Sequence, residues 1–168
     1  MKGKILPRTL LGIGLLSLLV GCNGESMDGR IVAAWPESKL AAVPDTLALG
    51  DHLLTVSASL GRDYFPPAPV NGRPLAAYIE LASGSDAPPS LQPVSGIIRV
   101  VYGDRMWVVA ARIEPPSDYE TRKRFRFLAS NGPLWGPGDE ATVVLEFADE
   151  FQERRLLLAR RVMISRSE

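Results

Sequence analysis

Short runs of alternating apolar and polar residues, separated by turns rich in Pro and Gly, recur in this sequence from residue 54 to residue 164. A period of two places every second side chain on one face of an extended strand, so each run predicts a β-strand with a buried face. The runs comprise residues 54–60, 75–81, 97–102, 105–113, 141–147 and 156–164. Since no stretch shows a persuasive amphipathic helix, the pattern predicts an all-β domain.

The dipeptide Gly103-Asp104 separates two of these runs. A two-residue turn requires positive φ angles that Gly and Asp adopt readily, which predicts a β-hairpin. In the second strand of this hairpin both faces are apolar, with Met106 on one face and Trp107 on the other. We therefore expect a strand that is covered on both faces. The polar stretch 149–153 has the length of another hairpin loop.

About seven strands joined by short turns favour an antiparallel β-sandwich over residues 51–168. Their order, with the Pro- and Gly-rich turn 135–139 before the penultimate strand, resembles the immunoglobulin-like and fibronectin-like sandwiches of bacterial envelope proteins. The Cys-Trp-Cys signature of antibody domains is absent, so the resemblance implies an architecture and no binding mode. A small β-barrel is the alternative fold.

The N-terminus has a different composition from the rest of the chain. Residues 1–8 contain Lys2, Lys4 and Arg8 without an acidic residue, and residues 10–20 carry no charge. This pattern is typical of a secretory signal, and the run is too short to cross a bilayer, which takes about 20 apolar residues. Residues 1–21 are therefore predicted to be a signal peptide that is removed.

The signal ends in Leu19, Val20, Gly21 and Cys22, which resemble the lipobox of bacterial lipoproteins. In that family the cysteine thiol receives a diacylglyceryl group, the chain is cut before it, and the new amine is usually acylated. The resemblance implies that Cys22 holds the protein in the cell envelope, because two or more acyl chains anchor stably. Asn23 in place of Asp favours the outer membrane if the cell is Gram-negative. The alternatives are a secreted protein with a stray cysteine and an uncleaved signal anchor.

Residues 22–50 are expected to form a lipid-anchored tether and an edge strand. Residues 23–30 have the composition of a flexible linker. Residues 31–35 are predicted to form the edge strand, which Pro36 ends. Residues 38–43 are suited to a single helical turn.

Charge and cysteine content exclude several classes of protein. The 19 Lys and Arg residues balance 19 Asp and Glu residues, and removal of the signal leaves a small net negative charge, which gives no reason to expect nucleic acid as a partner. Cys22 is the only cysteine. Once it carries lipid, the domain has no disulfide and no set of Cys and His for a metal centre, and no cofactor is expected.

Residues suited to catalysis are few. His52 is the only histidine, so a Ser-His-Asp arrangement would need it as the base. Ser57 and Ser59 lie together on a predicted strand, and no G-x-S-x-G motif occurs. We therefore expect His52 to be a partly exposed residue at the end of a strand.

Two acidic clusters, 139–140 and 149–153, lie beside predicted turns. Paired carboxylates can hydrolyse glycosides or bind calcium. Phe151 and Gln152 interrupt the alternating oxygens of a calcium loop, so we expect solvated turns, with a weak cation site as the alternative. The corresponding enzyme hypothesis is action on an envelope polymer through Asp139, Glu140, Asp149, Glu150 and Glu153.

Two surface features are candidates for partner contact. The first is Tyr64 and Phe65 in the Pro-rich loop 64–69, which either contact a partner or close one end of the core. The second is a basic face that would bind an anionic lipid or glycan. The alternation in 122–127 predicts that Phe125 and Phe127 point inward, which leaves the arginines of this run on the surface. The residues of the basic face are Arg122, Arg124 and Arg126, with Arg154, Arg155, Arg160 and Arg161. Charges that protect strand edges from pairing are the simpler interpretation of this second feature.

The sequence therefore favours a lipid-anchored envelope protein without catalytic activity, serving as a binding or assembly module. The expected partners are the membrane, through Cys22, and either another envelope protein or an anionic glycan or lipid. An enzyme acting on envelope polymer and a purely structural or stress-related lipoprotein are the alternatives.

Overall fold

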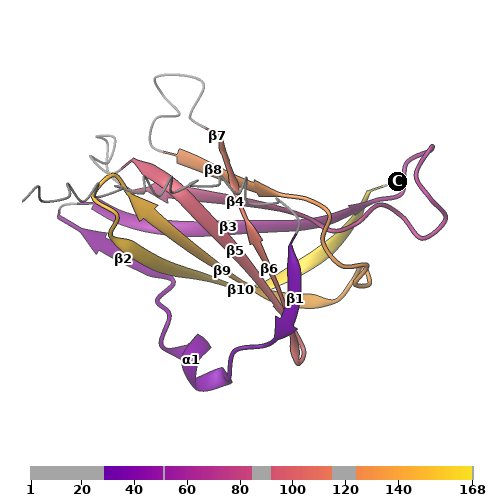
Figure 1. The fold of residues 1–168 in the computed structure, drawn as a ribbon, viewed down its shortest axis with the longest axis horizontal. Coiled ribbons are helices and arrows are strands. Elements are labelled where there is room, and N and C mark those ends of the chain that lie inside the picture. Colours follow the sequence, from indigo (N-terminus) through magenta and orange to yellow (C-terminus); the bar gives the residue numbers. More distant parts are fainter. Residues whose placement is uncertain (1–28, 51, 85–91, 115–123, 168) are drawn as a thin grey trace, which may run out of the picture.

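The alternating runs form strands in the computed structural model, which describes residues 29–50, 52–84, 92–114 and 124–167 (Figure 1). The lipobox residues and Arg122 lie outside these ranges. Within them the fold is all-β apart from one short helix, α1 (Glu37–Ala41), which confirms the expected class. The strands are β1 (Arg30–Ala33), β2 (Thr46–Leu49), β3 (His52–Asp63), β4 (Ala76–Ser83), β5 (Pro93–Tyr102), β6 (Arg105–Ala110), β7 (Arg112–Glu114), β8 (Arg124–Ala129), β9 (Glu140–Asp149) and β10 (Arg154–Ser167).

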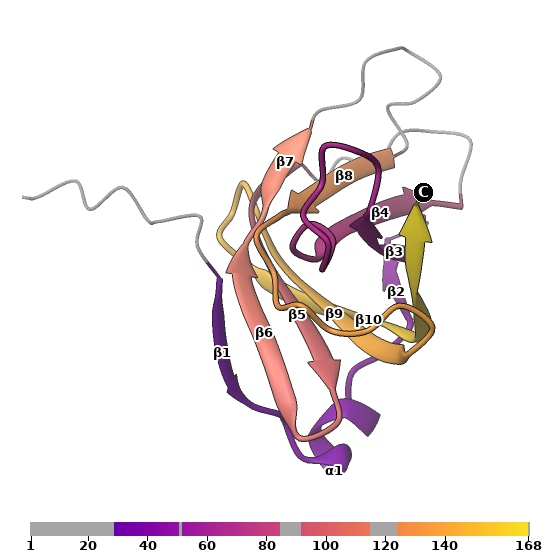
Figure 2. The same cartoon turned by 90° about the vertical axis from the view of Figure 1, so that its right-hand side faces the viewer.

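The described strands form one sheet in the order β1-β6-β5-β9-β10-β3-β4-β8-β7, and β2 also pairs with β3 beside this path. All pairs are antiparallel except β10 with β3, which is parallel. Only Ala111 separates β6 from β7, and its N–H donates to the Gly96 carbonyl of β5 at 2.9 Å. The β7 end of the sheet therefore lies next to β5 and β6 near its other end, and the sheet curls into a half-barrel (Figure 2).

The immunoglobulin-like detail is not confirmed by this arrangement. Strand β10 pairs with β9 from Arg154 to Met163 and with β3 from Ile164 to Ser167, so it belongs to both sides of the curl. The fold is consequently a continuous mixed sheet, whereas the expected sandwich has two separate antiparallel sheets.

The main core lies inside the curl. Its largest fully buried side chains are those of Trp107, Phe127 and Phe147, which come from β6, β8 and β9. The rings of Phe127 and Phe147 contact each other with centres 6.4 Å apart. Phe125 is partly buried against the same cluster, so both phenylalanines of β8 face the core as predicted.

A second apolar cluster covers the outer face of β5, β6, β9 and β10. Leu40 and Val43, in α1 and just after it, pack there against Met106, Val144 and Leu158. The N-terminal residues thus contribute to the domain: β1 pairs with β6 at the end of the sheet, and β2 pairs with β3. Because Met106 and Trp107 are buried in different clusters, the prediction that this strand is covered on both faces is confirmed.

The predicted hairpin is also confirmed, since Tyr102 pairs with Arg105 across the two-residue turn. Gly103 has a φ of 58°, a conformation that glycine adopts without steric cost. Elsewhere β10 contains a bulge between Ala159 and Val162.

Candidate functional site

An apolar hollow of about 490 Å³ extends over the outward side of β3, β4 and β8 and reaches β10 and the β6–β7 segment. Its floor consists of small residues, five of them at outward strand positions and the last just after β8: Ser59, Gly61, Ala76, Ala110, Ser165 and Ser130. Small side chains leave the surface of a sheet uncovered, so a partner can approach the backbone closely. We call this hollow the outer groove.

Apolar side chains and Arg112 line the outer groove, and Arg126 lies beside it against the Tyr78 ring. Tyr78 and Leu128 are direct cross-strand neighbours on β4 and β8, and both line the groove. The guanidinium carbon of Arg126 lies 5.9 Å from the centre of the Tyr78 ring. Arg112 lines the other side and pairs with the Glu114 carboxylate at 2.8 Å. An apolar surface with a cationic margin is suited to a segment that carries both apolar and acidic side chains.

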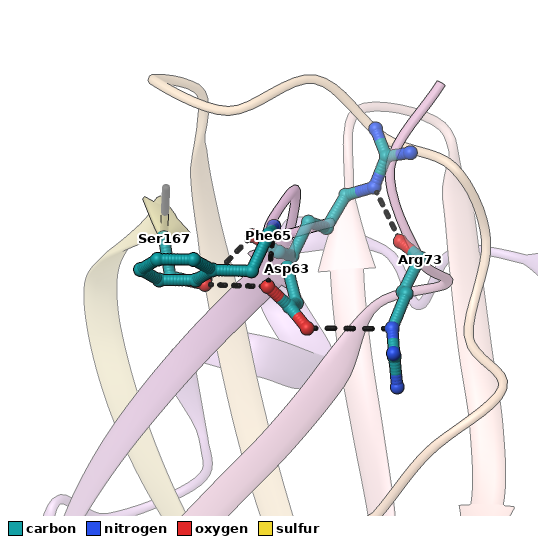
Figure 3. A network of polar contacts seen from close by, with 5 residues as sticks. Asp63, Phe65, Arg73 and Ser167 are labelled. Atoms are coloured by element: carbon teal, nitrogen blue, oxygen red, sulfur yellow. Dashed lines mark hydrogen bonds and ion pairs between the residues drawn. The ribbon is translucent and has the colours of Figure 1, made fainter. Parts of the chain in front are cut away.

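A second hollow, of about 420 Å³, adjoins the outer groove and shares Gly61, Ala76 and Ser130 with it. It ends at a polar network around Asp63 (Figure 3). The Asp63 carboxylate accepts a hydrogen bond from the Phe65 N–H at 2.9 Å and pairs with Arg73 at 3.3 Å. Ser167 lies beside the same carboxylate at 3.5 Å, so this network joins β3, the loop that follows it and the end of β10.

Arg62 holds this end of the molecule together from inside. It is 4% exposed, and its guanidinium donates to the carbonyl oxygens of Arg73 at 3.1 Å, Trp135 at 3.1 Å and Asn71. These carbonyls belong to two loops that lie far apart in the sequence. Because its donors are matched by main-chain acceptors, the buried guanidinium fixes both loops against β3.

Tyr64 and Phe65, two of the predicted contact residues, have different surroundings. The Tyr64 ring is half-buried, and the guanidinium carbons of Arg62 and Arg166 lie 5.2 and 4.3 Å from its centre. It also packs so closely on Gly72 that a Cβ there would lie 2.5 Å from the ring. Phe65 is 54% exposed. Tyr64 therefore helps to fix the loop, and Phe65 is the residue of this pair that is available to a partner.

The other predicted contact residues lie on β8. Arg124 and Arg126 are exposed, as the alternation predicts, and Arg124 pairs with Glu80 of β4 at 3.1 Å. Arg124 is opposite Ala82 on β4, whereas Tyr64 follows the end of β3 where Gly61 is opposite Ala76. At ~3.3 Å per residue Ala82 and Ala76 are roughly 20 Å apart along β4, and Tyr64 lies three residues beyond Gly61. The predicted residues thus lie toward opposite ends of one surface.

The remaining arginines of the expected basic face are on β10, which β3 and β4 separate from β8. Arg154 pairs with Glu146 at 3.2 Å, and Arg155 pairs with Glu153 and with Asp149. Arg160 and Arg161 are at the bulge. The structure therefore places the arginines of β8 and of β10 on strands that are not neighbours.

His52 is at the start of β3, partly exposed, with Nδ1 3.2 Å from the Ser83 hydroxyl. Ser57 and Ser59 are exposed, five and seven positions further along the same strand. At ~3.3 Å per residue the Cα atoms of both serines lie about 16 Å or more from that of His52, so neither hydroxyl is within hydrogen-bond reach of the imidazole as a general base.

Asp139, from the first acidic cluster, accepts a hydrogen bond from one member of a stacked aromatic pair. The Tyr102 hydroxyl donates to its carboxylate at 2.7 Å, and the Tyr102 ring stacks on Trp135 with centres 5.0 Å apart. This hydrogen bond raises the pKa of Tyr102, with burial and the Asp139 charge acting in the same direction. Asp139 therefore connects the β5–β6 hairpin to the turn before β9.

Asp149, from the second cluster, is buried at the end of β9. One carboxylate oxygen accepts hydrogen bonds from the N–H groups of Phe151 at 2.9 Å and Glu153 at 3.0 Å, while the other lies 3.6 Å from Arg155. These contacts stabilise the β9–β10 turn. In the described parts of the chain, no three His, Cys, Asp or Glu side chains group together to hold a metal ion.

No protein-family model matches the chain, and no curated protein or solved structure matches it significantly. Of the helices among the described residues, none is long and apolar enough to cross a membrane.

Two features of this surface are not predicted from the sequence: the outer groove and the role of Arg62. A signal for the groove is present in the pattern, because the outward positions of β3 and β4 include Ser59, Gly61 and Ala76 where longer polar residues are usual. Arg62 gives no such signal, since its burial depends on carbonyls from two loops whose positions follow from the complete fold.

Proposed function

We propose that this protein is a lipid-anchored envelope protein whose β-domain binds another envelope protein without catalysing a reaction. The lipid anchor is inferred from Leu19, Val20, Gly21 and Cys22, which match the lipobox pattern at the end of a charged and then apolar segment. We further propose that the domain is related to immunoglobulin-like domains. In support of this relationship, one core cluster lies between the opposing sides of the curled sheet.

One observation carries the binding proposal: an apolar floor of small residues lies beside the cationic side chains of Arg112 and Arg126. This combination favours an extended protein segment with apolar side chains against the floor and carboxylates at the margin. Asp139 and Asp149 make structural contacts, which supports binding over acid catalysis. An anionic glycan or lipid would engage the arginines without using the apolar floor.

The groove is tested by placing a photo-crosslinking residue at Tyr78 and irradiating intact membranes. We expect a discrete crosslinked protein, and we expect the added variant Ala76→Arg to abolish it because a long side chain fills the floor. The matched control is Ala48→Arg, on the exposed side of β2 away from the groove. Loss of the crosslinked protein in both variants, or a crosslink to glycan or lipid in place of protein, would reject a protein segment as the occupant.

The anchor is tested separately by mass spectrometry of the mature N-terminus. We expect an acylated Cys22 in the wild-type protein and an unlipidated product from Cys22→Ala. Affinity capture from membranes with the two forms then shows whether the partner depends on the anchor. An N-terminus other than acylated Cys22 would contradict the proposed localisation.

A further inference from the structure

The bulge in β10 turns two consecutive arginines to the same side of the sheet. Ala159 is opposite Val143 and Val162 is opposite Ala141, so Arg160 and Arg161 together face the single residue Thr142. Val162 belongs to the core cluster and Ala159 packs against it, whereas both arginines are exposed. In a regular strand one of two consecutive side chains would point into the core. The additional residue therefore brings both guanidinium groups to the outer surface.

The two arginines line a polar hollow of about 520 Å³ between β3 and β10. The hydroxyl-bearing residues Ser57, Ser59 and Ser165 line the same hollow. On this side of β3, pairing with β2 ends at Thr55 and pairing with β10 begins at Leu60. The edge formed by residues 56–59 therefore has no strand partner among the described residues, and its main-chain groups are open to the hollow.

Arg161 has a φ of 53°, a left-handed conformation that non-glycine residues rarely adopt. Residues held in such conformations often serve binding or catalysis, and bulges are common beside functional sites because they redirect side chains. Among the described residues, no carboxylate forms an ion pair with Arg160 or Arg161, in contrast to Arg154 on the same strand, which pairs with Glu146. The guanidinium groups at the bulge are thus available to an external anion.

We propose that this hollow binds a phosphodiester. Guanidinium groups match phosphate oxygens in geometry and donate paired hydrogen bonds. The hydroxyls of Ser57 and Ser59 provide further donors, whereas the Ser165 hydroxyl already donates to the Leu60 carbonyl at 2.8 Å. Asp45 lines the hollow with Arg160 and Arg161, which gives the lining a net charge of about +1. This charge matches the single negative charge of a phosphodiester better than that of a polyanion. The same chemistry occurs in phospholipid headgroups and in free glycerophosphodiesters.

Calorimetric titration of the full chain in an uncharged, phosphate-free detergent tests the inference, with glycerophosphoglycerol as the probe and glycerol as the uncharged control. We expect Arg160→Gln and Arg161→Gly to raise Kd at least tenfold. Glycine is chosen at residue 161 because it keeps the positive φ and removes the guanidinium. Arg154→Gln, on the same strand but outside the hollow, should leave Kd within twofold. Asp45→Asn should lower Kd by removing the opposing charge.

The source of the phosphodiester is distinguished by repeating the titration with dihexanoyl phosphatidylglycerol below its micelle concentration. A lower Kd than that of glycerophosphoglycerol identifies a lipid headgroup, and an equal Kd identifies a free diester. Absence of binding by the wild-type chain, or equal losses in Arg160→Gln and Arg154→Gln, would overturn the inference. Circular dichroism and Tm confirm that each variant is folded. The outer groove and Cys22 are unchanged in these variants, so failure here is separate from failure of the proposed function.

Discussion

Ala159 and Val162 pack in the same core although they are three positions apart on β10. Residues three apart in a regular strand point to opposite faces. The additional residue at the bulge resolves this conflict, and β10 can therefore leave β9 and continue beside β3 with Ile164 still facing inward.

Deletion of Arg161 should be tolerated by the fold. Without it, Ala159, Arg160 and Val162 alternate regularly against Val143, Thr142 and Ala141, and no core side chain changes face. We expect cooperative unfolding with a loss of about 0.5–2 kcal/mol in the free energy of unfolding, a typical effect of one change. Denaturant titration measures this loss.

The matched deletion of Met163 lies two residues further on, where β10 is regular. It would turn Ile164 from the core to the surface, so we expect a loss above about 4 kcal/mol or failure to fold. Equal damage from the two deletions would show that the bulge does not absorb the additional residue.

Arg62→Met should destabilise the protein more than the loss of any exposed arginine. The substitution keeps most of the buried volume but removes the donors to the carbonyls of Asn71, Arg73 and Trp135. Unsatisfied buried acceptors make a loss of about 2–4 kcal/mol the expected result in denaturant unfolding.

Arg73→Met is the matched control for Arg62→Met. The Arg73 side chain is 55% exposed and pairs with Asp63 at the surface, so its loss should cost less than about 1 kcal/mol. Its main-chain carbonyl still accepts from Arg62. Similar losses for the two variants would show that the buried guanidinium does not hold the loops.

Local sequence signals were sufficient for most strands and for one turn. The hairpin at Gly103-Asp104 depends on two residues whose backbone preferences agree with the flanking alternation, and it was predicted correctly. The inward positions of Phe125 and Phe127 followed from the same period of two. These features could be predicted because they depend on neighbours in the sequence.

The curl of the sheet and the parallel pairing of β10 with β3 could not be predicted in the same way. They join strands separated by most of the domain, and pairing between distant strands is decided by packing of the whole core. The bulge did leave a sequence signal, because Ala159-Arg160-Arg161-Val162 cannot alternate regularly. The outer groove also depends on which strands become neighbours, so its small residues had meaning only after the strand order of the sheet was known.

Gly96→Ala should destabilise the domain because β5 passes very close to β8 at this position. An added Cβ would lie 2.6 Å from Cδ1 of the fully buried Phe127 ring. Overpacking of this kind costs about 1–3 kcal/mol, measured by denaturant unfolding. Gly84→Ala is the control, since its nearest neighbour would be the Leu53 carbonyl at 3.6 Å.

Combining Gly96→Ala with Phe127→Leu tests the cause of this destabilisation. The shorter side chain should relieve the clash, so the double variant should lose less stability than the two single losses together. Strict additivity would mean that the ring is not the source of the strain.

Tyr102 should lose its proton at a higher pH than an ordinary tyrosine. Its hydroxyl donates to the Asp139 carboxylate, and this hydrogen bond raises its pKa from 10.0. The raised pKa means that the folded state favours the neutral phenol. The resulting stabilisation is complete below pH 10.0 and is lost as the pH rises through the folded-state value.

The difference in absorbance at 295 nm between the wild type and Tyr102→Phe isolates this titration. Asp139→Asn should move its midpoint down toward 10.0, whereas Glu140→Gln, which removes a neighbouring carboxylate, should leave it in place. An unchanged midpoint in Asp139→Asn would contradict the assigned cause.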